Sequence, residues 1–160
     1  MFLLQMKSAG EKILLYQFSE ERLTAVKAVF KQMNIPTHVL RPDAFQHKIG
    51  YLLGLRGFGP TTFDKDAKFS FPHEVMVMHN IKKKRLDEVL QVLRDNDLKI
   101  PYKAVVTPFN TLWTLERLCE TMEKEHAYMM ARSENKAVAP ANTHELLDAN
   151  EREMENSQED

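Results

Sequence analysis

The stretch ILLYQFSEERLTAVKAVFKQMNIPTHVLRPDAFQHKIGYLLGL, residues 13–55, decides the fold that this sequence predicts. It opens with an apolar run, and apolar residues at helical spacing then follow Ser19, a favourable N-cap. A short apolar run at 37–41 predicts a second strand, and Pro42 opens a second helix that we expect to continue to Leu55. The stretch therefore predicts strand, helix, strand, helix.

The same order of elements returns in the second half of the chain. A shift of 63 residues places Arg22 on Arg85, Leu23 on Leu86, Val26 on Val89 and Val29 on Val92. An insertion around residues 99–101 changes the shift to 66, after which Val39 meets Val105 and Pro42 meets Pro108. We therefore predict two copies of one β-α-β-α unit, residues 12–55 and 74–131.

Four strands are expected, at residues 12–18, 37–41, 74–79 and 102–107, and strands that alternate with helices predict an α/β fold. The strands of both copies are apolar without alternation, which indicates that helices cover both faces of the sheet. With the first strands of the two copies parallel at the centre, right-handed crossovers give the order 2-1-3-4. The alternative is a ferredoxin-like α+β fold, with an antiparallel sheet and helices mainly on one side.

The composition is that of an ordinary globular protein, with 43% apolar and 28% charged residues in 160. We expect one globular domain at residues 12–132, a lead-in at 1–11, and an acidic, disordered tail at 133–160. The net charge of −1 does not favour nucleic acid or an anionic membrane. One cysteine cannot form an internal disulfide, and no apolar run is long enough to span a bilayer, so we expect a cytoplasmic protein.

The usual chemical motifs are missing from the sequence. No two of the six histidines are four residues apart, and there is no HExxH or CxxC pattern, so we expect no metal and no cofactor. Cys119 falls on the apolar side of its helix, where a buried inert thiol is expected. The three glycines within residues 54–60 follow a helix rather than a strand, which indicates a helix C-cap and a turn rather than a phosphate loop.

Three lysines at the start of the third predicted helix form the first candidate site. Lys82, Lys83 and Lys84 stand where the first copy has Ser19-Glu20-Glu21, a sequence suited to a helix start. A helix start presents free N–H groups to an anion, and lysines add to that attraction. We therefore expect an anion site there, for a phosphate-bearing ligand, a nucleic-acid backbone or the acidic tail of the chain.

The second candidate site depends on the parallel arrangement of the two leading strands. Ligands of open α/β sheets bind at the carboxyl ends of the strands where the strand order reverses. That crevice would be lined by Gln17, Phe18 and Ser19 from one copy and by His79, Asn80 and Ile81 from the other. His79 and Gln17 would supply its polar contacts. Further along, Asn110 is expected to cap a helix and Trp113 to anchor an edge of the core.

Three segments together resemble a known protein family. They are LLYQFSEERL at residues 14–23, GYLLGL at 50–55 and KAVVTPFNTLWTLERL at 103–118. The chain resembles, over residues 12–126, a bacterial family catalogued as domain of unknown function 3783. The resemblance implies a small bacterial protein, and it implies no activity, because none is established for the family.

The leading interpretation is a non-catalytic binding or regulatory module for a small anionic ligand or a protein partner. The first alternative is an enzyme acting at the strand ends around His79. The second is a structural subunit that forms a homo-oligomer through an uncovered face of the sheet. Nucleic acid fits poorly, because one basic turn does not make a basic surface.

Overall fold

The computed structural model describes residues 10–136, so most of the expected lead-in and tail lies outside the described residues. The chain divides into two units, Met1–Glu123 and Lys124–Asp160. The sheet and its core belong to the first unit. The described part of the second is the remainder of a helix, in which the Arg132 guanidinium lies over the Tyr128 ring.

Four strands and six helical segments make up the described residues. The strands are β1 (Lys12–Tyr16), β2 (Thr37–Val39), β3 (Val75–His79) and β4 (Tyr102–Val105). The α-helices are α2 (Glu20–Gln32), α3 (Ile49–Leu52), α4 (Lys83–Asp95) and α5 (Leu115–Lys136), and two 3-10 helices are η1 (Pro42–Gln46) and η2 (Asn110–Leu112). Strands and helices alternate, so the α/β prediction is confirmed.

The sheet has the order β2-β1-β3-β4 that the sequence predicted. The central pair of strands was predicted to be parallel, and this was wrong. β1 and β2 are parallel, and so are β3 and β4, whereas the central pair β1 and β3 is antiparallel. Leu14 pairs with Val77, which is its counterpart at a shift of 63 residues. The register is therefore symmetric about this pair, and a two-fold rotation relates the leading strands.

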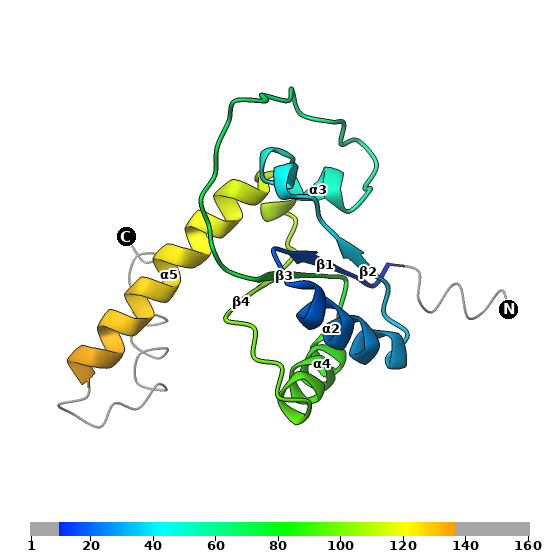
Figure 1. Cartoon of the computed structure of the whole chain (residues 1–160), viewed down its shortest axis with the longest axis vertical. Helices are drawn as coiled ribbons and strands as arrows, with labels where there is room; N and C mark the ends of the chain where they lie inside the picture. The colour runs from blue at the N-terminus through cyan, green and yellow to red at the C-terminus, as the bar shows by residue number, and fades with distance from the viewer. Residues whose placement is uncertain (1–9, 137–160) are drawn as a thin grey trace, which may run out of the picture. The chain divides into compact units, whose positions relative to one another are not determined.

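Helices cover both faces of the sheet, as the apolar strands predicted. Ile13 and Leu15 pack with buried residues of α2 and α4, whereas Leu14 packs with buried residues of α3 and α5. Figure 1 shows α2 and α4 on one side of the strands and α3 on the other. Because neighbouring residues of a strand point to opposite faces, an unbroken apolar strand requires both layers.

The helix expected from Pro42 to Leu55 is divided in two. His47 and Lys48 are extended between η1 and α3, and Lys48 forms an antiparallel bridge with Thr114. The Ile49 N–H donates to the Trp113 carbonyl at 2.9 Å, and the Leu115 N–H donates to the His47 carbonyl at 3.0 Å. These bonds between distant segments outweigh the local helix propensity.

The second half departs from the prediction at the corresponding place. α5 begins at Leu115, and its first turn is capped by Thr114, whose hydroxyl accepts from the Arg117 N–H at 3.2 Å. The predicted cap, Asn110, lies in η2 instead, and Leu112 of the same segment is 61% exposed. In the first half, the Ser19 cap of α2 is confirmed by a 3.3 Å bond from the Arg22 N–H.

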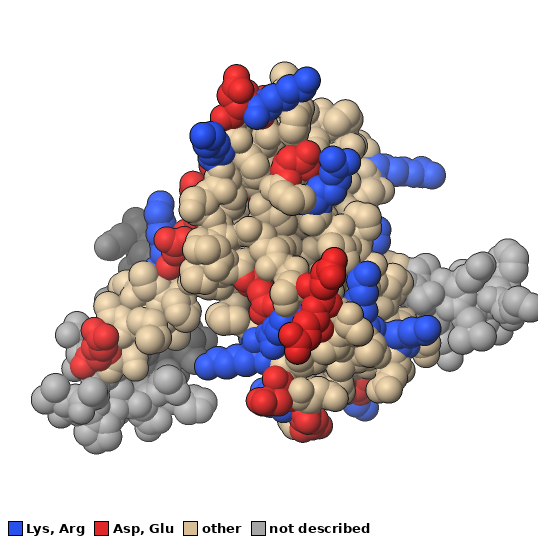
Figure 2. Space-filling view, viewed as in Figure 1, with Lys and Arg blue, Asp and Glu red and all other residues tan. Residues whose placement is uncertain are grey.

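The face in Figure 2 carries charges of both signs. Lysine and arginine side chains are interspersed there with aspartate and glutamate side chains. This face therefore has no extended field of one sign, in accordance with the net charge of −1.

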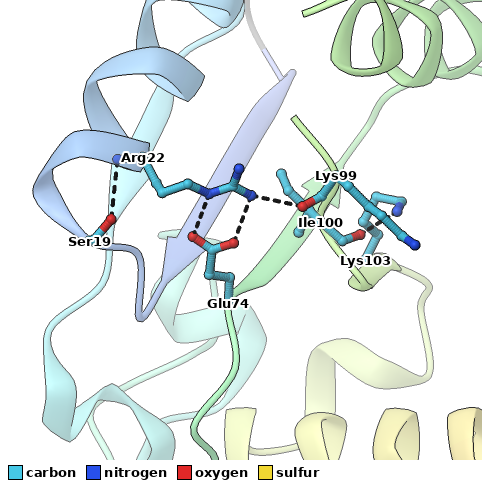
Figure 3. A network of polar contacts seen from close by, with 6 residues as sticks. All are labelled: Ser19, Arg22, Glu74, Lys99, Ile100 and Lys103. Carbon is cyan, nitrogen blue, oxygen red and sulfur yellow. Dashed lines mark hydrogen bonds and ion pairs between the residues drawn. The ribbon is translucent and has the colours of Figure 1, made fainter. Parts of the chain in front are cut away.

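Two equivalent ion pairs connect the halves of the first unit. Arg22 on α2 binds Glu74 with two bonds of 3.0 and 2.8 Å and also donates to the Lys99 carbonyl at 2.8 Å (Figure 3). In return, Arg85 on α4 binds Glu11 at 3.2 Å and donates to the Met33 carbonyl. The shift of 63 residues places Glu11, the acid bound by Arg85, on Glu74, the acid bound by Arg22. The two halves thus share their contacts, while their origin by duplication stays a prediction.

Candidate functional site

The crevice expected between the leading strands does not form, because β1 and β3 are antiparallel. Tyr16 at the end of β1 lies opposite Val75, and His79 at the end of β3 lies opposite Lys12. The carboxyl ends of the two strands are therefore about 14 Å apart, at about 3.4 Å per residue. The prediction that Gln17–Ser19 and His79–Ile81 share one crevice was wrong.

The residues of that predicted crevice have structural contacts of their own. The Gln17 side chain donates to the Phe71 carbonyl, half-buried Phe18 packs against the core beneath α2 and α4, and Ser19 caps α2. At the opposite end of the sheet, Asn80 takes a left-handed φ of 56°, a conformation that asparagine tolerates better than most residues. Their predicted role in ligand binding is not tested by this arrangement.

The three lysines predicted to bind an anion lie at the start of α4, where all three are exposed. Lys82 is the N-cap residue and makes no side-chain capping bond, and Lys83 and Lys84 form the first turn. Their positions agree with the prediction, and the anion site itself stays a prediction.

Burial alters the pKa of two side chains that were considered as reactive groups, His79 and Cys119. Burial, helped by the charge of Lys12, lowers the pKa of His79, which keeps the imidazole neutral. Burial and the nearby carboxylates of α5 raise the pKa of the Cys119 thiol to about 12, so the expectation of a buried thiol is confirmed. Among residues 10–136 no group of three histidine, cysteine or acidic side chains is placed to hold a metal ion.

A groove of about 590 Å³ beside β2 is the candidate site that the structure reveals. It follows the outer edge of β2 and is bordered by η1, α3 and the loop that comes after α3. Its lining is formed by His38, Val39, Leu40, Arg41, Asp43, Ala44, His47, Tyr51, Leu52, Pro60, Thr61 and Phe63.

Hydrogen bonds hold η1 and the loop in place around this groove. The Tyr16 hydroxyl donates to the Pro42 carbonyl at 3.1 Å and so joins η1 to β1. Gln46 binds the backbone of Asp64 twice, through its amide nitrogen at 3.0 Å and its amide oxygen at 2.9 Å. These bonds fix the loop residues that form one wall of the groove.

The glycines of the GYLLGL motif shape the same loop. Gly54, with a φ of 74°, ends α3, and the N–H groups of Gly54 and Leu55 return to the carbonyls of Tyr51 and Gly50. This is the helix C-cap and turn that the sequence predicted. The ring of Phe58 lies so close to Gly50 that a Cβ there would meet it at 2.5 Å. The motif therefore serves to fold the loop back onto α3.

The groove combines apolar side chains with polar groups that are weakly engaged. The Arg41 side chain is 85% exposed, and its Nε lies 3.8 Å from the Asp43 carboxylate, too far for a strong hydrogen bond. His47 stacks on Tyr51 with ring centroids 4.7 Å apart. The Nδ1 of His47 is buried and has no hydrogen-bond partner among the described residues. Such an atom costs free energy unless something binds it.

The residues of the second half that correspond to those of the groove bind one another or the backbone. At the positions of His47 and Tyr51 it has Trp113 and Arg117, whose guanidinium lies 4.3 Å from the centre of the indole ring. At the position of Ala44 it has Asn110. The Asn110 side chain accepts from the Thr107 N–H at 2.8 Å and donates to the Val105 carbonyl at 2.9 Å. Alanine has no polar side-chain atom, so the corresponding groups of the first half lack this partner.

Sequence reasoning did not find the groove, because its residues come from three elements and a loop. The signal that could have found it is a difference between the aligned copies. Ala44 and His47 stand opposite Asn110 and Trp113 at a shift of 66, whereas the strands around them match. This local mismatch lies where the two halves differ in their side-chain hydrogen bonds and ring contacts.

Residues 74–129 match the model of the family described as Domain of unknown function (DUF3783). The predicted resemblance to this family is therefore confirmed over residues 74–129, which contain the third of the three segments, residues 103–118. The match spans β3, α4, β4, η2 and most of α5, which together have the order β-α-β-α. No curated protein and no solved structure matches the chain. In the part of the chain that the structure describes, every helix is too short or too polar to cross a membrane.

Proposed function

We propose that the protein is a non-catalytic binding module that takes an anionic ligand with a carboxylate group into the groove beside β2. A cytoplasmic location is part of this proposal. The proposal keeps the function expected from the sequence and moves its site from the ends of β1 and β3 to the edge of β2.

The observation that carries the proposal is the polar content of the groove. His47 brings a buried nitrogen that no group of residues 10–136 binds, and Arg41 brings an exposed guanidinium whose own acid, Asp43, is 3.8 Å away. A guanidinium can bind a carboxylate with two parallel hydrogen bonds, which neutral donors cannot match. Pockets in proteins are mostly apolar with a few polar groups, and this groove has that composition.

The protonation of Cys119 and the position of His79 favour binding over catalysis. The Cys119 thiol is buried, and its raised pKa keeps it protonated at neutral pH. His79, around which an enzyme site was considered, lies at the end of β3 opposite Lys12, and the residues expected to accompany it lie at the other end of the sheet.

Binding of citrate, glutamate and inorganic phosphate to the full chain tests the proposal. We expect citrate or glutamate to shift the NMR signals of His38 and His47 and to raise the melting temperature. Arg41→Gln should weaken this binding about tenfold, since it removes a charge-assisted pair. Lys27→Gln, which removes an exposed charge from α2, is the matched control and should bind like the parent. Equal binding by the two variants would show that the groove is not the site.

A further inference from the structure

We propose that the groove receives an extended peptide from a protein partner, which adds to β2 as a fifth strand and places an acidic side chain on Arg41. This inference rests on the proposed function and names the class of its ligand. Three observations support it. β2 is an edge strand, Ala44 stands where Asn110 binds backbone groups in the second half, and the positive charge of Arg41 lies just beyond the end of β2.

Among the described residues, no strand pairs with the outer edge of β2, which borders the groove. β2 is the outermost strand of the sheet and pairs with β1 alone. The Ile13 N–H donates to the Pro36 carbonyl, and the Leu40 N–H donates to the Leu15 carbonyl. In a parallel ladder, residues that alternate with such bonded positions face away from the neighbouring strand. The N–H and C=O groups of Thr37 and Val39 therefore point outward, where an added strand would bind them.

At the opposite edge of the sheet, the outward groups at the end of β4 are bound by a side chain of the protein itself. Asn110 is the buried polar residue of the core, and its amide holds the outward Val105 carbonyl and the Thr107 N–H. Proteins commonly block exposed strand edges to prevent unwanted pairing. At β2 the matching residue is Ala44, so the Val39 carbonyl and the Arg41 N–H have no such side-chain partner within residues 10–136.

The groove supplies the selectivity that an edge alone lacks. Strand addition draws affinity from backbone bonds and specificity from pockets for alternate side chains. An added strand would direct every second side chain toward the α3 face, where Leu52 and Tyr51 line the groove and His47 has its unpaired nitrogen. The exposed Arg41 guanidinium at the end of β2 complements a carboxylate, so the partner segment carries aspartate or glutamate.

A pool of capped nonapeptides with glutamate fixed at the centre and random flanking residues is the probe. Peptides selected from it on the full chain are measured by amide hydrogen exchange. We expect the Thr37 and Val39 amides to gain at least about tenfold protection in the complex, while the outward amides of Lys103 and Val105 on β4 do not change. A pool from which nothing binds, or bound peptides that leave Thr37 and Val39 unprotected, would overturn strand addition.

Two variants test the same point by affinity. Ala44→Asn should close the edge as Asn110 does and weaken peptide binding about tenfold, the effect of losing one or two backbone bonds. Val39→Pro removes an outward N–H, which an edge strand tolerates, and should weaken binding similarly. Val105→Pro makes the same change on β4 and is the matched control that should bind normally. Melting curves show whether each variant is folded, and Val39→Pro serves alone if Ala44→Asn does not fold.

The outcomes separate this inference from the proposed function. If citrate binds in an Arg41-dependent manner while Ala44→Asn and Val39→Pro bind peptides as well as the parent, strand addition is overturned and the anionic site stands. If neither citrate nor any peptide binds, both are overturned. Loss of peptide binding in Ala44→Asn and Val39→Pro, but not in Val105→Pro, supports strand addition.

Discussion

At the scale of single residues, His79 shows how placement decides the charge of a side chain. It ends β3 opposite Lys12, and burial, with a smaller effect of that ammonium, lowers its pKa below the ordinary 6.5. The folded state thus favours the neutral imidazole. Protonation on unfolding then makes the protein less stable as the pH falls from about 6.5 through the lower pKa of the folded state.

We predict that the NMR titration of the His79 ring has its midpoint below 6.5. Lys12→Met should move that midpoint part of the way back toward 6.5, because it removes the repelling charge and leaves the imidazole buried. Lys12→Arg keeps the charge and is the control, with an unchanged midpoint expected. A midpoint at or above 6.5 in the parent would contradict the assignment.

At the scale of elements, the two long helices of the sheet layer begin in opposite ways. α2 starts with the Ser19 cap followed by Glu20 and Glu21, whereas α4 starts with lysines and lacks a side-chain cap. The positive end of a helix dipole favours acids and disfavours lysines, by about 0.3–1 kcal/mol each at low salt. The start of α4 is therefore less stable than it could be.

We predict that Lys83→Glu and Lys84→Glu each stabilise the protein by about 0.3–1 kcal/mol in urea titrations at low salt, and less at high salt. Lys31→Glu makes the same change in the last turn of α2 and should destabilise instead. The variants also test the anion site predicted for Lys82, Lys83 and Lys84. A third variant combines Lys82→Glu, Lys83→Glu and Lys84→Glu. If it binds phosphate or a polyanion as the parent does, that site does not exist.

Elements with a strong local signal were predicted well, and those shaped by distant contacts were not. The Ser19 cap followed from the residue type at the helix start, and the helix that buries Val26 followed from the spacing of its apolar residues. The break at His47 did not, because it depends on bonds to Trp113 and Leu115 in the other half. No window of neighbouring residues contains that information.

At the scale of the whole molecule, the halves of the first unit are joined by the antiparallel pair β1 and β3 and by two equivalent arginines. The Arg22 and Glu74 side chains are 31% and 21% exposed, so water only partly screens their pair. Each arginine also satisfies a backbone carbonyl of the opposite half, Lys99 for Arg22 and Met33 for Arg85.

We predict that Arg22→Met lowers the free energy of unfolding by about 1–2 kcal/mol and that Arg85→Met has a similar effect. Arg22→Lys should retain only a part of the stability that Arg22→Met loses, since an ammonium cannot make the two parallel bonds to Glu74. Urea denaturation followed by circular dichroism provides the measurement. Arg94→Met, which loses a bond to Gln91 within α4, is the control and should change stability by less than about 0.5 kcal/mol. A loss for Arg22→Met no larger than this control would show that the ion pair does not hold the halves together.

The sequence by itself determined the α/β class, the strand order, the two covered faces and the likeness of the two halves, because each follows from local spacing or from internal repetition. It did not determine how the halves are related, since the same repeat fits a translation with parallel leading strands or a rotation with antiparallel ones. That choice depends on hydrogen bonds and packing between residues about sixty positions apart. Because the leading strands are antiparallel, the expected crevice does not form. The groove arises instead from the packing of η1, α3 and the following loop beside β2.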